Sequence, residues 1–169
     1  MVRVAFCIGG YPPEEFKRRA DLALSYANAE IQVGIINVEA SPYFYGITPT
    51  EIQLVAPAFI DAYRRAEKEG YDAVVPLGML DLAVDGGRSA VEIPIVGPME
   101  PCLHVAALLG DRFGLIIFMK NCSPLTALSC AAMAWKIALS VLARAASTYP
   151  TWLRTATKSC KTSSMKQSG

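Results

Sequence analysis

The sequence has few of the residues that build metal sites. Its 169 residues include one histidine, His104, and five cysteines that form no CxxC pair and no zinc spacing. This composition argues against a histidine-based metal centre, and we expect no metal. An odd, scattered set of thiols is typical of a reducing compartment rather than of a disulfide framework. Because the first residues also lack a secretory signal pattern, we expect a cytoplasmic location.

Nucleotide-binding glycine motifs are also missing from the sequence. Gly9 and Gly10 follow a short apolar stretch, but the chain contains no GxGxxG and no Walker lysine. Pro12 and Pro13 remove two backbone donors from the turn that follows. The pattern therefore disfavours a phosphate cradle. Two interpretations remain: a tight turn between a strand and a helix, or the lining of a site for a smaller anionic ligand.

Acidic residues are absent from the last part of the chain. Residues 1–118 hold all 15 acids against nine Lys and Arg, a net charge of −6. Residues 119–169 hold seven Lys and Arg and no acid, a net charge of +7, together with 14 Ser and Thr and three of the five cysteines. A charge step of this size predicts that the two parts differ in role or origin. We therefore divide the chain into residues 1–118 and an atypical Ser/Thr/Lys-rich segment, residues 119–169.

Four interpretations of residues 119–169 stay open. They are a docking helix with a disordered end, a basic amphipathic arm, a membrane span over residues 125–146, and an out-of-frame read. Lys136 in the middle of such a span would cost about 2.5–3.5 kcal/mol on insertion, and Arg144 lies near its end. We therefore expect no membrane and no nucleic-acid partner, with the span as the alternative. Loss of acids with gain of Ser and Cys is what a shifted reading frame would give.

The first 118 residues do contain an alternation of strand and helix patterns. The chain is 53% hydrophobic and 18% charged, which is the composition of a globular domain. Short apolar stretches predict five strands, over residues 2–8, 31–38, 71–75, 93–96 and 113–118. Helical patterns lie between them, over residues 12–27, 48–70 and 100–110. The alternation predicts a doubly wound parallel α/β sheet of the flavodoxin- or Rossmann-like three-layer type, followed by a helical or irregular C-terminal segment.

Ligands of doubly wound sheets bind outside the carboxyl ends of the strands. The turns after the predicted strands are therefore the candidate binding positions. We expect the substrate-binding residues to be Gly9, Gly10, Tyr11, Tyr45, Gly78, Met79, Asp81 and Glu100. Residues 43–45 form an aromatic tip that either closes over a small substrate or packs as an Ω-like loop. Asp81 and Asp85 either bind a substrate or cap the short helix expected after the third strand, and capping is favoured for Asp85.

The cysteines differ in their expected surroundings. Cys7 lies inside the first predicted strand and is predicted to be a small buried apolar residue. Cys102 lies in the first turn of a predicted helix, where the dipole can lower a thiol pKa, so reactivity and a structural role both stay open. His104 is two residues further on and points away from Cys102 on a helix, which disfavours a Cys–His dyad.

Three segments share an order and spacing with a known family: SPYFYGITPTE, AEKEGYDAVVPLGMLD, and IPIVGPMEP with AALLGDRFGLI. Together they resemble the aspartate/glutamate/hydantoin racemase superfamily over about residues 2–118. The resemblance implies two similar α/β lobes with the substrate between them, and no cofactor. It also implies proton transfer at the carbon next to a carboxylate or imide, with a small carboxylate, amino acid or hydantoin as substrate. Two thiols on opposite faces of that carbon would remove and return the proton.

The sequence departs from the family pattern in two places. The first-lobe cysteine falls at about Gly78, and a glycine there resembles the arylmalonate decarboxylase branch, which keeps only the second-lobe cysteine. After residue 118 no second lobe is recognisable, so residues 119–169 are interpreted as a frameshifted or truncated second lobe. No catalytic cysteine is carried over, and Cys122 and Cys102 stay as candidates.

Three functions follow from this resemblance and its departures. They are a racemase, a decarboxylase of the arylmalonate type, and a catalytically inactive remnant or small-ligand-binding domain. A single lobe would leave uncovered the apolar face that a second lobe normally buries, and exposed apolar patches seek partners. We therefore also expect a homo-oligomer.

Overall fold

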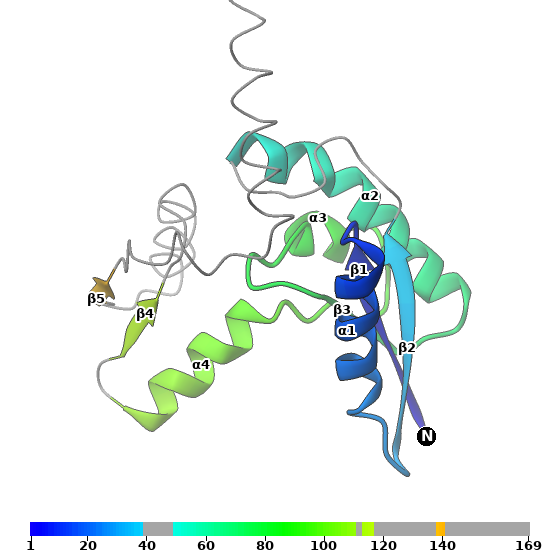
Figure 1. Cartoon of the computed structure of the whole chain (residues 1–169), viewed down its shortest axis with the longest axis horizontal. Helices are drawn as coiled ribbons and strands as arrows, with labels where there is room; N and C mark the ends of the chain where they lie inside the picture. The colour runs from blue at the N-terminus through cyan, green and yellow to red at the C-terminus, as the bar shows by residue number, and fades with distance from the viewer. Residues whose placement is uncertain (39–48, 111–112, 117–137, 141–169) are drawn as a thin grey trace, which may run out of the picture.

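The computed structural model describes residues 1–38, 49–110, 113–116 and 138–140 (Figure 1). The aromatic tip with Tyr45, the candidate Cys122 and most of residues 119–169 lie outside this described part. Within it, no helix is both long enough and apolar enough to cross a bilayer. Of the alternative span over residues 125–146, only residues 138–140 are described, and they form a strand.

Among the described residues, the central sheet consists of three parallel strands. They are β1 (Val2–Gly9), β2 (Ile31–Val38) and β3 (Ala73–Pro76), in the order β2-β1-β3. In this register Cys7 of β1 lies opposite Ile36 of β2 on one side and Pro76 of β3 on the other. Since all three strands run in the same direction, their carboxyl ends meet at one edge of the sheet.

Two of the described helices cover the sheet. Helix α1 (Pro13–Leu24) begins with a proline and carries Glu14 and Glu15 in its first turn, where acidic side chains suit the helix dipole. Helix α2 (Pro49–Lys68) also begins with a proline. Because β2 and β3 flank β1 on opposite sides, right-handed crossovers place α1 and α2 on opposite faces. Figure 1 shows α1 in front of the strands. The predicted three-layer α/β class is thereby confirmed.

The core lies between the sheet and α2. One face of α2 is buried at helical spacing through Val55, Phe59, Tyr63 and Ala66, as its sequence pattern predicts. The rings of Phe59 and Tyr63 have centroids 6.3 Å apart. Cys7 packs against this face with no exposed surface, which confirms the predicted buried apolar role.

The fourth and fifth predicted strands do not extend the central sheet as expected. Residues 93–96 lie beside β3 but form a single parallel bridge, between Val74 and Ile95. Pro94 accepts a hydrogen bond from the Val74 N–H at 3.0 Å, yet it has no N–H with which to continue the ladder. Strand β4 (Gly114–Ile116) pairs in parallel with β5 (Ala138–Ser140) in a separate two-stranded sheet.

Helix α3 (Val84–Arg88) and helix α4 (Met99–Leu109) follow β3. Figure 1 shows α4 and the β4–β5 pair to one side of the three strands. Helix α4 buries Met99 and Leu103 on its inner face. It leaves large apolar side chains exposed at its other end, namely Val105, Leu108 and Leu109. A helix that is apolar on nearly all sides is normally covered.

Candidate functional site

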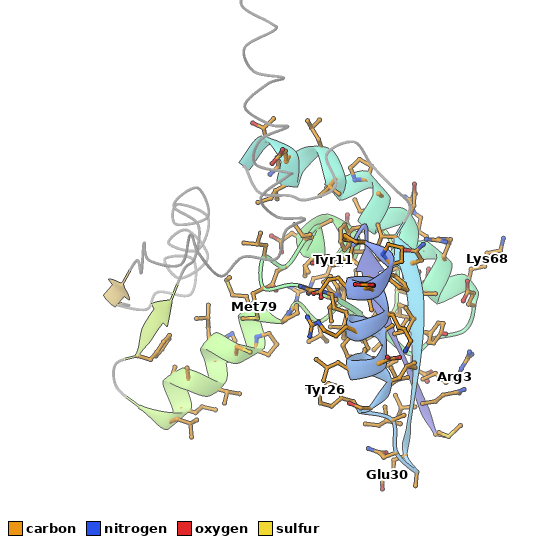
Figure 2. All side chains as sticks on the ribbon, viewed as in Figure 1. Arg3, Tyr11, Tyr26, Glu30, Lys68 and Met79 are labelled. Carbon is orange, nitrogen blue, oxygen red and sulfur yellow. The ribbon has the colours of Figure 1, made fainter. Side chains whose placement is uncertain are left out.

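Three turns meet at the carboxyl edge of the sheet. Residues 9–11 end β1 and form the turn after it, residues 77–83 follow β3, and residues 97–100 follow the extended segment beside β3. The turn after β3 is linked to strand β1, because the Leu77 N–H donates to the Cys7 carbonyl at 2.9 Å. The edge therefore carries seven of the predicted binding residues: Gly9, Gly10, Tyr11, Gly78, Met79, Asp81 and Glu100. Figure 2 labels Tyr11 and Met79 from two of these turns.

The turn after β1 places an aromatic ring beside a charged pair. Gly10 has a φ of 40°, a left-handed conformation that favours glycine. The Arg19 guanidinium lies 4.0 Å from the centroid of the Tyr11 ring, a cation–π contact. Burial raises the pKa of the Tyr11 hydroxyl, and Arg19 opposes that rise. Glu15 accepts hydrogen bonds from Arg18 and Arg19, which lower the pKa of its carboxyl to about 2.

A small cavity opens between this turn and the end of β2. Its volume is about 210 Å³, below the roughly 300–1,000 Å³ of sites for drug-sized ligands. Its walls combine apolar side chains with one amide and one phenol, contributed by Gly10, Tyr11, Pro13, Phe16, Asn37 and Val38. A cavity of this size and lining suits a small molecule with both apolar and hydrogen-bonding groups.

The turn after β3 presents bare backbone to open space. Gly78 has a φ of 143°, which side-chain-bearing residues rarely adopt, and a Cβ built there would meet no atom of the described residues within 4 Å. The neighbouring Met79 side chain is 48% exposed. Where the resemblance places the first thiol of a racemase, this chain has no side chain and unfilled space in front of the backbone.

The Asp81 side chain binds the start of α4, whereas its backbone carbonyl accepts the Val84 N–H at the start of α3 at 3.2 Å. Its two carboxylate oxygens accept hydrogen bonds from the backbone N–H groups of Met99 at 2.8 Å and Glu100 at 3.0 Å. Burial raises the pKa of the Asp81 carboxyl, whereas these two N–H groups and Arg88 lower it. The neighbouring Glu100 carboxylate adds to the rise. Asp81 therefore caps a helix that begins 18 residues later.

The expected capping role of Asp85 is wrong. Helix α3 begins after Ala83, which has a φ of 56°, and no side chain caps it. Asp85 lies inside the first turn of α3, where its side chain is fully exposed and lies 3.9 Å from Arg88. Ala83, in a left-handed conformation, occupies the N-cap position of this helix. Asp85 is the second residue of the helix and therefore does not occupy that position.

Three further residues support this turn and were not predicted from the sequence as site residues. The Tyr63 hydroxyl donates a hydrogen bond to the Leu82 carbonyl. Arg88 pairs with Glu100 at 2.7 Å and donates to the Ile95 carbonyl. A Cβ on Gly97 would lie 2.4 Å from the Asp81 Cγ. The buried position of Tyr63 on α2 was a usable signal, because a buried tyrosine hydroxyl needs a partner.

The thiols of the described residues have different surroundings. Burial raises the pKa of the Cys7 thiol to about 12, with Arg65 opposing the rise, and Cys7 belongs to the core. Cys102 is exposed in the first turn of α4, and His104 is exposed on the same helix. Within the described part of the chain, His, Cys, Asp and Glu side chains form no cluster of three that could hold a metal ion.

Comparison with solved structures shows the same fold. The structure is similar to allantoin racemase from Klebsiella pneumoniae, with a TM-score of 0.71 and 14% identity over 83% of this chain and 58% of that one. It is similar to allantoin racemase from Pseudomonas fluorescens, with a TM-score of 0.64 and 18% identity over 82% of this chain and 60% of that one. A double mutant of arylmalonate decarboxylase gives a TM-score of 0.56 and 13% identity over 84% and 62%.

The chain thus spans about three fifths of the length of these solved structures. The comparison with curated proteins gave no match. The sequence matches the family described as Asp/Glu/Hydantoin racemase over residues 27–146, so the match runs across residue 118, where the charge composition changes. This match covers well over half of the 169 residues. The chain therefore belongs to the Asp/Glu/Hydantoin racemase family.

Proposed function

We propose that this protein performs cofactor-independent proton transfer at a carbon next to a carboxylate or imide. The observation that carries the proposal is the meeting of two glycine turns and a small cavity at the carboxyl edge of the sheet, in a chain of the racemase family. Removing a proton from such a carbon leaves a carbanion. Its charge spreads onto the adjacent carbonyl oxygen, where hydrogen-bond donors stabilise it.

The proposed substrate site uses residues from each of the three turns. Gly9 and Gly10 bring backbone close to the substrate, and Tyr11 forms a wall of the cavity. Gly78, Met79 and Glu100 do not line this cavity, and we propose that they contact the substrate from the turn after β3 and from the start of α4. Tyr45, which lies outside the described residues, belongs to the same proposed site. The substrate is a small carboxylate, amino acid or hydantoin.

Cys102 and Cys122 are the proposed acid/base candidates. Cys102 is exposed in the first turn of α4, two residues after Glu100 of the proposed site. Cys122 lies outside the described residues. A thiol takes up and returns a proton at neutral pH when its pKa lies near the working pH.

Deuterium exchange tests the proposal directly. The full chain is incubated in heavy water with hydantoins and with free amino acids, and deuterium at the α-carbon is followed by proton NMR. We expect exchange that the Cys102→Ser or Cys122→Ser variant lowers at least tenfold. A folded protein that gives no exchange with any of these substrates would contradict the proposal and favour a small-ligand-binding domain or a remnant.

Decarboxylation of the arylmalonate type is the alternative, and Gly78 is the observation that favours it. One structural neighbour is an arylmalonate decarboxylase mutant in which a glycine is replaced by cysteine and a cysteine by serine. Release of carbon dioxide from a disubstituted arylmalonate, without exchange on hydantoins, would support the decarboxylase. The variant Gly78→Cys, whose side chain meets open space, is then expected to gain racemisation, because it adds a second acid/base group.

Self-association is also proposed. The support is the exposed apolar end of α4, where Leu108 is 86% exposed and Leu109 is 83% exposed. Covering such side chains removes apolar surface from water, which favours association. Light scattering is expected to give at least twice the monomer mass, and a monomer at high protein concentration would contradict this. The cytoplasmic location stays a prediction.

A further inference from the structure

We propose that Asp81 is a positioning residue that fastens the turn after β3 to the first turn of α4. Through this tie it sets the backbone at Gly78 and Met79. The tie itself is independent of the reaction, whereas its effect on proton transfer rests on the proposed function. Asp81 thus acts on the substrate through the turn rather than by contact.

The tie uses both oxygens of one carboxylate. Oδ1 accepts the Met99 N–H at 2.8 Å and Oδ2 accepts the Glu100 N–H at 3.0 Å. Both donors are first-turn N–H groups, which have no partner within their own helix. The Asp81 carboxylate lies against Gly97, where a Cβ would come within 2.4 Å of Cγ and 2.7 Å of each oxygen. Only glycine at position 97 leaves room for this contact.

The turn needs such a tie because its backbone is strained. Asp81 has a φ of 46° and Ala83 a φ of 56°, and residues with a Cβ rarely adopt this left-handed conformation. Two such residues within three positions persist only when their surroundings hold them. The Tyr63 hydroxyl holds the Leu82 carbonyl from the α2 side, and the start of α4 holds Asp81 from the other side.

A second tie makes the start of α4 a fixed anchor. Arg88 of α3 pairs with Glu100 at 2.7 Å and donates to the Ile95 carbonyl at 3.3 Å. Ile95 in turn forms the bridge to Val74 of β3. The first turn of α4 is therefore held to the sheet as well as to Asp81. Because the Asp81 carboxylate is bound to the fixed first turn of α4, the backbone at Gly78, three residues earlier in the chain, is fixed as well.

The variant Asp81→Asn tests the tie with little change in size. Asparagine tolerates the left-handed conformation, so a loss of backbone preference does not confuse the result. Its amide can accept only one of the two N–H groups. The matched control is Asp85→Asn, which makes the same change of charge at a fully exposed aspartate four residues away.

Amide signals of the labelled full chain give the readout. In Asp81→Asn we expect hydrogen exchange at Met99 or Glu100 to speed up at least tenfold, and the amide signals of Gly78 and Met79 to move. Asp85→Asn is expected to leave these four amides unchanged. Unchanged signals of Gly78 and Met79 in Asp81→Asn would overturn the proposal, as would an equal change in both variants.

The variant Gly97→Ala approaches the same tie from the opposite side. Its Cβ displaces the Asp81 carboxylate, so we expect the same four amide changes, and no further change when Gly97→Ala is added to Asp81→Ala. If Gly97→Ala leaves Met99 and Glu100 protected, the proposal fails, even where Asp81→Asn does not fold.

Where the wild-type chain exchanges deuterium into a substrate, Asp81→Asn separates positioning from contact. We expect a kcat lowered at least tenfold with KM within threefold, because a displaced turn misaligns the bound substrate while Gly9, Gly10 and Tyr11 of the other turn still hold it. A raised KM with unchanged kcat would identify Asp81 as a substrate contact and overturn its positioning role. Absence of exchange in the wild type would count against the proposed function alone, since the amide signals still decide the tie.

Discussion

The turns after β1 and after β3 end neighbouring strands at the same edge of the sheet, yet they are held in different ways. The turn after β1 leads at once into α1, and its glycine at position 10 and the prolines that follow shape it locally. The turn after β3 contains two strained residues, Asp81 and Ala83, and depends on contacts to α2 and α4.

The two turns thus show that the backbone of a site can be fixed by neighbouring residues in the chain or by contacts with distant segments. A turn shaped by its own glycines and prolines changes little when distant residues are replaced. A turn held by distant side chains changes when any of them is lost. In the described residues, the turn after β1 is therefore shaped by its own sequence, whereas the turn after β3 is held by distant side chains. Substitutions on α2 or α4 should change the backbone of the turn after β3 only.

The largest expected effect comes from removing the support on α2. Tyr63→Ala empties a fully buried position and removes the hydrogen bond to the Leu82 carbonyl. We expect it to lower the free energy of unfolding by about 3–5 kcal/mol, measured by urea denaturation. Tyr26→Ala, at a side chain that is 63% exposed, is the control and should stay within about 0.5 kcal/mol. A loss below about 1 kcal/mol at Tyr63 would show that the turn does not depend on it.

A smaller effect is expected from glycine replacements in the two turns. Gly78→Ala forces a side chain into a φ of 143° and should cost about 1–3 kcal/mol, although the space around it is open. Gly10→Ala, at a φ of 40°, should cost about 1–2 kcal/mol. Chemical denaturation of both variants gives the ranking. No loss of stability in Gly78→Ala would mean that the turn can adopt another backbone conformation.

Glu15 at the start of α1 and Asp81 in the turn after β3 should change the free energy of unfolding with pH in opposite directions. The folded-state pKa of Glu15 is lowered to about 2, so its contribution is present above pH 4.5 and is lost as the pH falls towards 2. Burial raises the folded-state pKa of Asp81. Its contribution to the free energy of unfolding is therefore greatest at low pH and is lost as the pH rises through that pKa.

Urea denaturation across pH 2–7 compares the wild type with Glu15→Gln and Asp81→Asn. Each variant should remove the part of the pH dependence of unfolding that its own carboxyl group causes. For Glu15 this part is about 0.5–1 kcal/mol, because its ion pairs lie near the surface. Parallel pH profiles for the wild type and Asp81→Asn would contradict the raised pKa.

The smallest effect on stability is expected at the thiols. Cys102→Ser changes an exposed side chain and should alter the free energy of unfolding by less than about 0.5 kcal/mol. Alkylation followed by peptide mass mapping should modify Cys102 in the native protein within minutes. Cys7, buried and with a pKa of about 12, should react only after unfolding. Equal rates at both thiols would show that β1 is open to solvent.

Much of the fold was predictable because it follows from local patterns. The apolar stretches gave β1 and β2 to within one residue, and the face of α2 with Val55, Phe59 and Tyr63 is buried as its spacing predicts. The structure of the segment around Pro94 was harder to predict. Its apolar residues predict a strand, but a missing N–H limits it to one bridge beside β3. Apolar periodicity does not reveal which strands will pair, so the separate β4–β5 pair was not predicted.

The candidate site shows the same division. The position of Gly9, Gly10 and Gly78 at strand ends could be predicted, since parallel strands end at one edge. The partner of Asp81 could not, because a carboxylate after a strand suits a substrate, a local cap or a distant helix equally well. Asp81 binds the distant helix because α4 packs beside the turn. The substrate role of the other residues and of Cys102 stays a prediction.

By itself, the sequence determined the alternation of strands and helices, the edge at which the turns meet, and the absence of a thiol at position 78. These follow from periodicity and from the residue present at one position. Only the tertiary structure decided that Asp81 binds N–H groups 18 residues away, that Tyr63 holds Leu82, and that Gly97 makes room for a carboxylate. The physical reason is that hydrogen bonds between distant segments depend on how the helices pack, and local patterns do not record this packing.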